Sequence, residues 1–262
     1  MTDAGLPIAE VFVDGTRATC ARVEVTDSRL TPIGRAILSI DKAQSERVVL
    51  RNRATVAIGM GYQNTGLRKV FGGRIRHVDP GDVAVGVVAL DAMADLEGMR
   101  VKRSFANASL QDVVRASLDE HQVRHELAST ETRRARHFVA PNLSLLQVLA
   151  AARTTWGAQD WDLWADVDGK VWFGPWAETA RSKADPVGDL EYGSNLLAFE
   201  PSTRGTGMAE TLLAPEIEHS RRVRLWHRDL WQGALTVRID RATHVVDGDQ
   251  VAKTRLEWTL AS

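Results

Sequence analysis

The sequence contains one cysteine, Cys20, among 262 residues. A single thiol excludes a framework of disulfides within the chain. No apolar run approaches the roughly 20 residues that a membrane-spanning helix requires. Residues 1–5 have neither the basic nor the apolar region of a signal peptide. These absences predict synthesis in the cytosol and no insertion into a membrane by the protein alone.

An excess of charge of either sign is also missing. The 33 basic residues nearly balance the 34 acidic residues, and the net charge is -1. Such a balance gives no general attraction to nucleic acid or to anionic membranes. The apolar content of 44% and the charged content of 26% are ordinary. The chain is long enough for one large domain or two to three small ones.

Recognised catalytic signatures are absent as well. No Gly-x-Ser-x-Gly, His-Glu-x-x-His or Cys-x-x-Cys motif occurs. Cys20 lies in an alternating segment without an identifiable histidine partner, so packing or simple exposure is its predicted role. The run of Gly59, Gly61 and Gly66 precedes another predicted strand, which favours a turn over a phosphate loop. Carboxylates are so numerous that a glycosidase-like pair can be neither identified nor excluded.

Two histidines, His121 and His125, have the spacing of metal ligands on one helical face. A third ligand at a diagnostic spacing is missing, and both lie where a helix is predicted to end. Capping or lining of this helix–strand junction is therefore the favoured interpretation. Metal binding stays as a weaker alternative, and we predict no metal and no cofactor.

Tryptophan is the residue type that stands out. Eight tryptophans occur, and five of them fall within 21 positions, at residues 156–176. They could form a platform for sugars, pack a core, or form a subunit interface, where tryptophan is enriched. We favour core plus interface, because large aromatic side chains dominate both kinds of burial. Candidate interface residues are Trp161, Trp164, Trp172, Trp176, Arg222 and Arg224, the two arginines sharing one face of a predicted strand.

The first ninety residues are predicted to be mainly β. Residues 18–26 alternate, with Val23 and Val25 on one face and Glu24 and Thr26 on the other. The frequent turns favour a small barrel or sandwich. Glycines 72 and 73 inside a strand indicate a bulge or a close approach of neighbouring backbone. Further short strands are predicted at residues 9–13, 37–40, 48–50, 55–60, 70–78 and 83–90.

Helices are predicted only after residue 91. Ser109 is a good N-cap for a helix that extends to about residue 118. A polar, exposed connector is predicted at residues 131–136. Pro141 and Asn142 then open a second helix that ends near Gly157.

The chain is predicted to return to β after this helix. A turn at Asp168 and Gly169 joins two strands of a hairpin. Residues 177–188 are polar and predict a linker, and residues 202–209 predict a flexible loop. A short strand is predicted before this helix, at residues 123–127, and further strands after it, at residues 196–200, 217–226, 235–241, 243–246 and 250–260.

The order of these pieces is more informative than any one of them. It consists of the strand Phe-Gly-Gly-Arg-Ile at 71–75, the segment 105–121, the helix from 142 leading into the hairpin, the strand at 195–202 and the strand at 254–258. In this order the chain resembles the late control protein D family of phage tail baseplate hubs. It is also similar to the hub part of the type VI secretion valine-glycine repeat protein G.

The resemblance implies an α+β, mainly β fold. It implies two tail-tube-like β-barrels, at residues 1–95 and 187–262, with a small α/β domain at 96–186 between them. It further implies a trimer, whose six barrels present a pseudo-sixfold face to a hexameric tail tube, while a spike or tip protein contacts the other end.

The expected function is a non-enzymatic baseplate hub of a phage tail or a tail-like particle. Its expected partners are two further copies of itself, the tail tube protein and the spike or tip protein, with tape-measure and baseplate wedge proteins as further candidates. DNA would pass through the lumen without specific binding. The chain stops after Ser262 without a spike, lysozyme or peptidase domain, so we expect such activities in other polypeptides. The alternative is a tail-associated peptidoglycan hydrolase or carbohydrate-binding module, which the tryptophans and carboxylates would serve.

Overall fold

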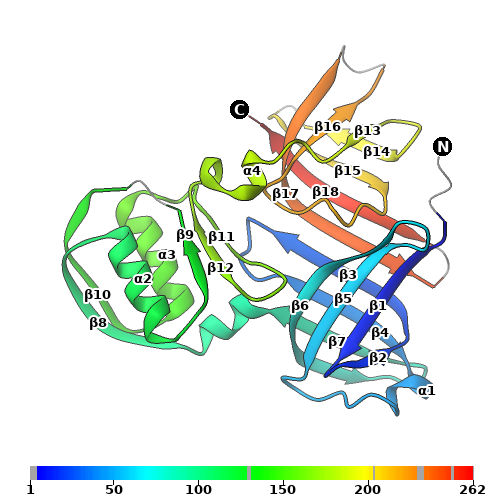
Figure 1. Cartoon of the computed structure of the whole chain (residues 1–262), viewed down its shortest axis with the longest axis horizontal. Helices are drawn as coiled ribbons and strands as arrows, with labels where there is room; N and C mark the ends of the chain where they lie inside the picture. The colour runs from blue at the N-terminus through cyan, green and yellow to red at the C-terminus, as the bar shows by residue number, and fades with distance from the viewer. Residues whose placement is uncertain (1–4, 129–130, 203, 229–232, 249–250, 262) are drawn as a thin grey trace.

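The computed structural model describes residues 5–128, 131–202, 204–228, 233–248 and 251–261. Within these ranges the protein is mainly β, as predicted, and one large sheet dominates it. Figure 1 shows this sheet on one side and a smaller part with the two longest helices on the other. No helix in the described ranges is both long and apolar enough to cross a membrane.

The elements fall into three groups along the chain. The N-terminal β unit comprises β1 (Pro7–Val13), β2 (Thr16–Ala18), β3 (Cys20–Ser28), β4 (Arg35–Asp41), α1 (Lys42–Ser45), β5 (Thr55–Tyr62), β6 (Gly66–Pro80) and β7 (Ala84–Asp91). The α/β unit comprises η1 (Ala92–Glu97), β8 (Arg100–Ser109), α2 (Leu110–Glu120), β9 (His125–Leu127), β10 (Arg134–Ser144), α3 (Leu145–Trp156), β11 (Asp162–Ala165), β12 (Val171–Gly174), η2 (Trp176–Glu178) and α4 (Ala180–Lys183). The C-terminal β unit comprises β13 (Asp189–Glu191), β14 (Leu196–Pro201), β15 (Thr206–Leu212), β16 (Arg222–Trp226), β17 (Ala234–Asp247) and β18 (Ala252–Leu260).

The two β units form one open sheet of 13 strands. Its main path is β14-β15-β18-β17-β3-β4-β7-β6-β5-β1-β2, and β16 and β13 branch from β17. No closed barrel occurs in the described ranges, so the expected pair of closed barrels is not observed. Strand β17 joins the two β units, because it is longer than its partner β16. Its first half pairs with β16, and its second half is left to pair with β3.

The hydrophobic core consists of three clusters, one in each unit. In the N-terminal β unit Val23 and Val25 are buried while Glu24 and Thr26 are not, as the alternation predicted. In the α/β unit the ring of Phe138 lies 6.1 Å from Phe105 and 5.7 Å from Trp156, measured between centroids. Separate clusters are compatible with the predicted domains 1–95, 96–186 and 187–262, whose boundaries stay a prediction.

Capping residues determine where both long helices begin. Ser109 caps α2 as predicted, because its hydroxyl accepts from the backbone N–H of Asp112, and the Asp112 carboxylate accepts from that of Ser109. The predicted start of the second helix at Pro141 was wrong. Ser144 and Gln147 form the capping box there, and α3 begins at Leu145.

The segment before α3 is a strand, which corrects the predicted connector at 131–136 from Arg134 onward, while residues 131–133 lie outside any strand. Strand β10 begins at Arg134 and passes through Pro141. A bulge between Pro141 and Leu143 breaks the ladder locally, and Asn142 has a φ of 71°. A strand at the edge of a sheet tolerates proline, because its outward N–H needs no partner in the ladder.

Other differences also have local causes. Ser220 has a φ of 63°, which interrupts the predicted strand 217–226, so that β16 begins at Arg222. The predicted loop 202–209 is a hairpin turn in its described part, since β15 begins at Thr206. Residues 48–50 lie outside any strand, residues 235–246 belong to the single strand β17, and the predicted linker 177–188 contains part of η2 and α4.

The β11–β12 hairpin attaches the α/β unit to the N-terminal β unit. A Cβ atom on Gly72 would lie 2.0 Å from the carbonyl oxygen of Val167 at the hairpin tip. Beside this contact, Lys69 Nζ lies 2.6 Å from Asp168 Oδ1. A Cβ atom on Gly73 would lie 2.2 Å from the carbonyl oxygen of Leu90. The close backbone approach predicted for these two glycines is therefore confirmed.

Gly72→Ala should destabilise the protein by about 1–3 kcal/mol, because the methyl group would push the hairpin off the sheet. The measurement is the free energy of urea unfolding. Gly86→Ala is the matched control, since the atom nearest to its added Cβ would lie 3.5 Å away. Equal stability of the two variants would show that the hairpin does not depend on this contact.

Candidate functional site

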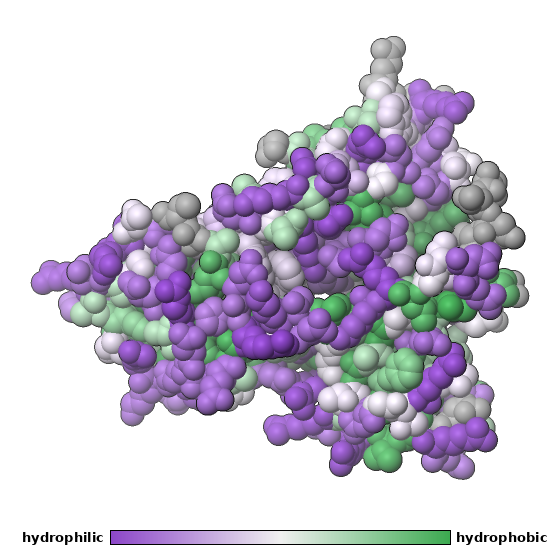
Figure 2. All heavy atoms as spheres, in the orientation of Figure 1, coloured by the Kyte–Doolittle hydropathy of each residue, from purple (hydrophilic) through white to green (hydrophobic). Residues whose placement is uncertain are grey.

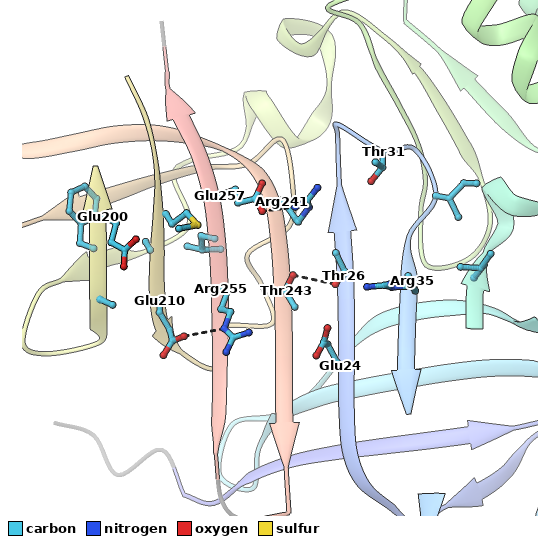
Figure 3. Close-up of a pocket in the computed structure, with 17 residues that line it drawn as sticks. Glu24, Thr26, Thr31, Arg35, Glu200, Glu210, Arg241, Thr243, Arg255 and Glu257 are labelled. Atoms are coloured by element: carbon cyan, nitrogen blue, oxygen red, sulfur yellow. Dashed lines mark hydrogen bonds and ion pairs between the residues drawn. The ribbon is translucent and has the colours of Figure 1, made fainter. Parts of the chain in front are cut away.

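A broad hollow lies on one face of the continuous sheet. It has a volume of about 760 Å³ and is bordered by β14, β15, β18, β17, β3, β4 and β7 (Figure 3). We call it the sheet hollow. Its polar lining consists of Glu24, Thr26, Thr31, Arg35, Glu200, Glu210, Arg241, Thr243, Arg255 and Glu257.

One register row carries this lining across both β units. Glu210 lies opposite Arg255, Arg255 opposite Thr243, Thr243 opposite Thr26, and Thr26 opposite Arg35. At the seam between the units the hydroxyls of Thr26 and Thr243 are 3.2 Å apart. Because side chains alternate along each strand, their neighbours point to the core instead. The β17–β3 ladder thus builds a single polar surface from two units.

The charges of the sheet hollow are largely paired. Arg255 Nε lies 3.2 Å from Glu210 Oε2, and Arg241 Nη1 lies 2.5 Å from Glu257 Oε1. Exposed ion pairs add little stability, but here they cancel one another's field. The described lining contains no serine, cysteine or histidine that could act as a nucleophile or base. The arrangement is a wet surface whose charged side chains are largely paired.

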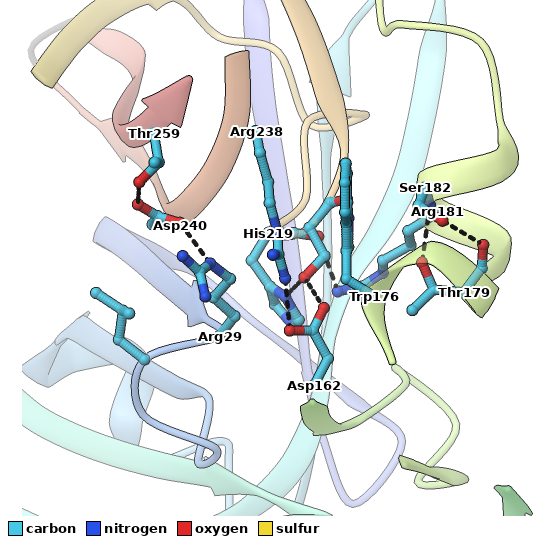
Figure 4. A network of polar contacts seen from close by, with 12 residues as sticks. Arg29, Asp162, Trp176, Thr179, Arg181, Ser182, His219, Arg238, Asp240 and Thr259 are labelled. Carbon is cyan, nitrogen blue, oxygen red and sulfur yellow. Dashed lines mark hydrogen bonds and ion pairs between the residues drawn. The ribbon is translucent and has the colours of Figure 1, made fainter. Parts of the chain in front are cut away.

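Behind the hollow, a buried polar network joins the α/β unit to the C-terminal β unit (Figure 4). Asp162 of β11 is 2% exposed and accepts hydrogen bonds from Ser220 Oγ at 2.5 Å and from Arg238 Nη2 at 2.6 Å. The indole of Trp176 donates to the carbonyl oxygen of Ser220 at 2.8 Å. We call these residues, together with His219, the junction network.

The junction network superficially resembles a hydrolytic triad. His219 Nδ1 lies 2.9 Å from Ser220 Oγ, and His219 Nε2 lies 3.3 Å from Asp27 Oδ1. Both His219 and Ser220 are fully buried, and the small hollow that reaches Asp27 is not lined by Ser220. Burial and the nearby guanidinium of Arg181 hold the pKa of His219 well below its usual value. These groups have a structural role, since no substrate can reach the hydroxyl.

The predicted tryptophans lie at or near this junction. Trp172 is 5% exposed and stacks on Trp164 with 5.8 Å between centroids. Arg181 lies 3.8 Å above the Trp164 ring, a distance typical of a cation–π contact. Trp161 packs on Phe173 within the α/β core. Packing within the chain is therefore observed, and contact of these residues with another subunit stays a prediction.

Arg222 and Arg224 lie on β16, away from the sheet hollow. Arg222 donates to the carbonyl oxygen of Ala184 at 3.2 Å, and Arg224 Nε lies 2.5 Å from Asp189 Oδ1. Between them Val223 is buried, as the predicted alternation requires. Their role at a subunit interface also stays a prediction.

The two histidines considered as metal ligands have local hydrogen-bond partners instead. His121 Nε2 lies 3.2 Å from the carbonyl oxygen of Arg100, and His125 Nδ1 lies 2.9 Å from that of Val123. Within the described ranges, no three His, Cys, Asp or Glu side chains gather as a metal site would require. Burial raises the pKa of the Cys20 thiol to about 12, which suppresses the thiolate.

Sequence reasoning missed both the sheet hollow and the junction network. Asp162 and Ser220 are 58 positions apart, and Thr26 and Thr243 are 217 apart. The available signal was the alternation of polar and apolar residues along each strand. That pattern names the residues of a face, but it does not say which strands share it.

Known structures share this fold, although no family model matches the sequence and no curated protein resembles it. The tail protein of prophage MuSo2 from Shewanella oneidensis aligns over 96% of this chain and 97% of its own, with a TM-score of 0.75 and 11% identity. A tail protein from Neisseria meningitidis aligns over 97% and 96%, with a TM-score of 0.75 and 11% identity.

A third similar structure comes from a secretion machine. It is an Escherichia coli component of the type VI secretion system, described as structurally similar to T4 bacteriophage tail proteins. It aligns over 96% of this chain and 77% of its own, with a TM-score of 0.70 and 12% identity. The chain thus has the fold of phage tail proteins and of their type VI secretion counterpart, which confirms the resemblance at the level of fold.

Asp162→Ala should destabilise the protein by about 3–5 kcal/mol, because it leaves the Arg238 guanidinium buried without its partner. Denaturant unfolding measures this loss, and adding Arg238→Met should restore part of it. Asp160→Ala removes an exposed carboxylate nearby and should change little. Additive losses in the double variant would show that the pair is not coupled.

The burial of His244 predicts that the folded protein loses stability in acid. It is buried beside Thr254 Oγ1 at 2.9 Å, and burial lowers its pKa to about 4. In the unfolded chain this histidine binds a proton near pH 6.5, whereas in the folded protein it stays neutral down to about pH 4. The stability that depends on neutral His244 is therefore fully present above pH 6.5 and is lost as the pH falls toward 4. The loss amounts to about 3 kcal/mol. The gap in unfolding free energy between wild type and His244→Asn should narrow from pH 7.5 to 4.5, and a constant gap would contradict this.

Proposed function

We propose that this protein is a structural, non-enzymatic baseplate hub of a phage tail or a related injection machine. Three copies form a ring that adapts a hexameric tail tube to a central spike or tip. The observation that carries the proposal is the sheet hollow, a polar face that two β units share across the β17–β3 ladder.

The number of β units supports the trimer. Each chain presents two β units side by side in one sheet, so three chains present six, which matches a hexameric partner. The main path of the sheet ends at β14, whose outer edge pairs with no named strand in the described ranges and is bridged only at Leu196, by Tyr192. Beside this edge Leu197 is 47% exposed and Met208 is 53% exposed. An open edge with apolar neighbours favours pairing with another chain.

The lining of the sheet hollow supports its role as the wall of a conduit. Nucleic acid is retained by unpaired lysine and arginine, whose contacts release counterions. Here Arg241 and Arg255 are paired with glutamates, so a passing polyanion meets little net positive charge. The surface is wet and charged, and its lining holds four glutamates against three arginines, so it has no net positive charge that would retain DNA.

The proposed partners are those of a tail hub. They are the tail tube protein, the spike or tip protein, and the tape-measure and baseplate wedge proteins as further candidates. Similar folds in a type VI secretion component and in a complex of PdpA with VgrG support this assignment. The proposed location is the baseplate of the virion tail or of a tail-like particle.

The alternative hydrolase or carbohydrate-binding function finds no supporting geometry. The tryptophans that motivated a sugar platform pack within the chain, with Trp172 only 5% exposed. The carboxylates of the sheet hollow are largely paired with arginine or lysine. Cell-wall zymography and glycan binding of the intact protein would test this alternative directly.

Analytical ultracentrifugation of the assembled protein should give a molecular mass of three times 28.9 kDa. Leu197→Asp should shift it to the monomer while far-UV circular dichroism stays unchanged, because the charge would lie at the proposed subunit contact. Val83→Asp, at a valine that is 84% exposed outside this edge, is the control and should remain trimeric. A wild-type monomer within intact particles would refute the trimeric hub.

A further inference from the structure

A second surface lies at the end of the molecule farthest from the large sheet. Strands β8 and β10 form a two-stranded ribbon there, with helices α2 and α3 on its inner side (Figure 1). Phe105 and Phe138 on the inner side are buried. The outward positions are all exposed, and we call them the outer ribbon face: Lys102, Ser104, Ala106, His137, Val139 and Pro141.

The register of the ribbon places these six residues in three opposed pairs. Ser104 lies opposite Val139 in the middle, and Lys102 and His137 flank this pair on the two strands. Val139 is 55% exposed, so the centre of the face is a small apolar spot. Figure 2 shows hydrophilic side chains over much of this end of the molecule.

All of the charged residues in the two strands of the ribbon are basic. Its two strands contain five arginine or lysine residues and no aspartate or glutamate, although the whole chain has a net charge of -1. All five side chains are exposed: Lys102 belongs to the outer ribbon face, and Arg100, Arg103, Arg134 and Arg136 lie at other positions of the two strands. Arg134 reaches Asp112 at 3.8 Å. The other four have no acidic partner within 4.0 Å in the described part of the chain.

We propose that the ribbon of β8 and β10 docks a second protein whose contact surface is acidic around an apolar centre. The outer ribbon face supplies the centre, and the exposed basic side chains of the same two strands supply the charge. Protein interfaces commonly have this anatomy, with an apolar middle and a polar, charged rim. The surface is distinct from the sheet hollow, and the proposal does not depend on the hub assignment.

Two other partner classes fit less well. Phosphates gain nothing from an apolar centre, and the aromatic rings of the ribbon are buried, so no base can stack on them. A membrane surface needs several large apolar side chains to insert, and on this face Val139 is the sole exposed one. The combination of basic rim and small apolar spot therefore favours an acidic protein.

Charged side chains can also have a protective role, because they keep exposed strand edges from pairing. Glutamate would protect an edge as well as lysine or arginine does. Reversal of charge therefore separates the two roles: a protective role tolerates it, and docking of an acidic partner does not.

The test uses the full chain in the strain that produces it. Val139 is replaced by the photocrosslinking residue p-benzoyl-phenylalanine, and the crosslinked peptide is identified by mass spectrometry. The same replacement at Val83, which is also exposed, is the control. The second variant adds Lys102→Glu and Arg136→Glu, and its control is Arg47→Glu, an exposed arginine outside the ribbon.

The expected result is a crosslink from position 139 to an acidic segment of one protein, with none from position 83. Charge reversal should lower its yield about tenfold, and lysine substitutions in the identified segment should restore it. The oligomeric state should stay unchanged, which separates this result from a failure of the hub. Absence of a crosslink, a crosslink to nucleic acid or lipid, or a yield unaffected by charge reversal would overturn the proposal.

Discussion

The ladder between β17 and β3 is the interaction on which the rest of the structure depends. It pairs the last third of the chain with the first and makes one open sheet from two β units. Without it, the row from Glu210 to Arg35 would be two unrelated half-surfaces. Such long-range pairing costs loop-closure entropy, which the surrounding contacts must offset. Contacts of the α/β unit with both β units offset part of this entropy cost.

The α/β unit fixes this arrangement from behind through two different contacts. At Gly72 the hairpin tip approaches so closely that a side chain would not fit. At Asp162 a buried carboxylate links the same hairpin to Ser220 and Arg238 of the C-terminal β unit. One hairpin therefore contacts both β units. A buried ion pair adds little net stability, but removing one partner is strongly destabilising, because the other charge is then buried without a partner.

The molecule separates its proposed tasks in space. The sheet hollow is polar with paired charges, as a neutral wall requires, and the ribbon of β8 and β10 carries unpaired positive charge at the opposite end. The near-zero net charge conceals this division. Charge acts locally, since exposed charges are screened beyond about 8–10 Å at physiological ionic strength. The composition of the whole chain therefore says little about any one of its faces.

Features that depend on near neighbours along the chain could be predicted from the amino-acid sequence. The alternation around Val23 and the cap at Ser109 were predictable, because each depends on residues a few positions apart. The glycines at 72 and 73 indicated a close backbone approach, but the chain segment that approaches Gly72, at Val167, is known only from the tertiary structure. Competition between local signals misplaced the start of α3 at Pro141. The contact of Thr26 with Thr243, 217 positions away, and the absence of a closed barrel among the described residues depend on the packing of the whole chain. An unpaired half-strand accepts any partner of matching pattern, so the choice belongs to the packing of the whole chain.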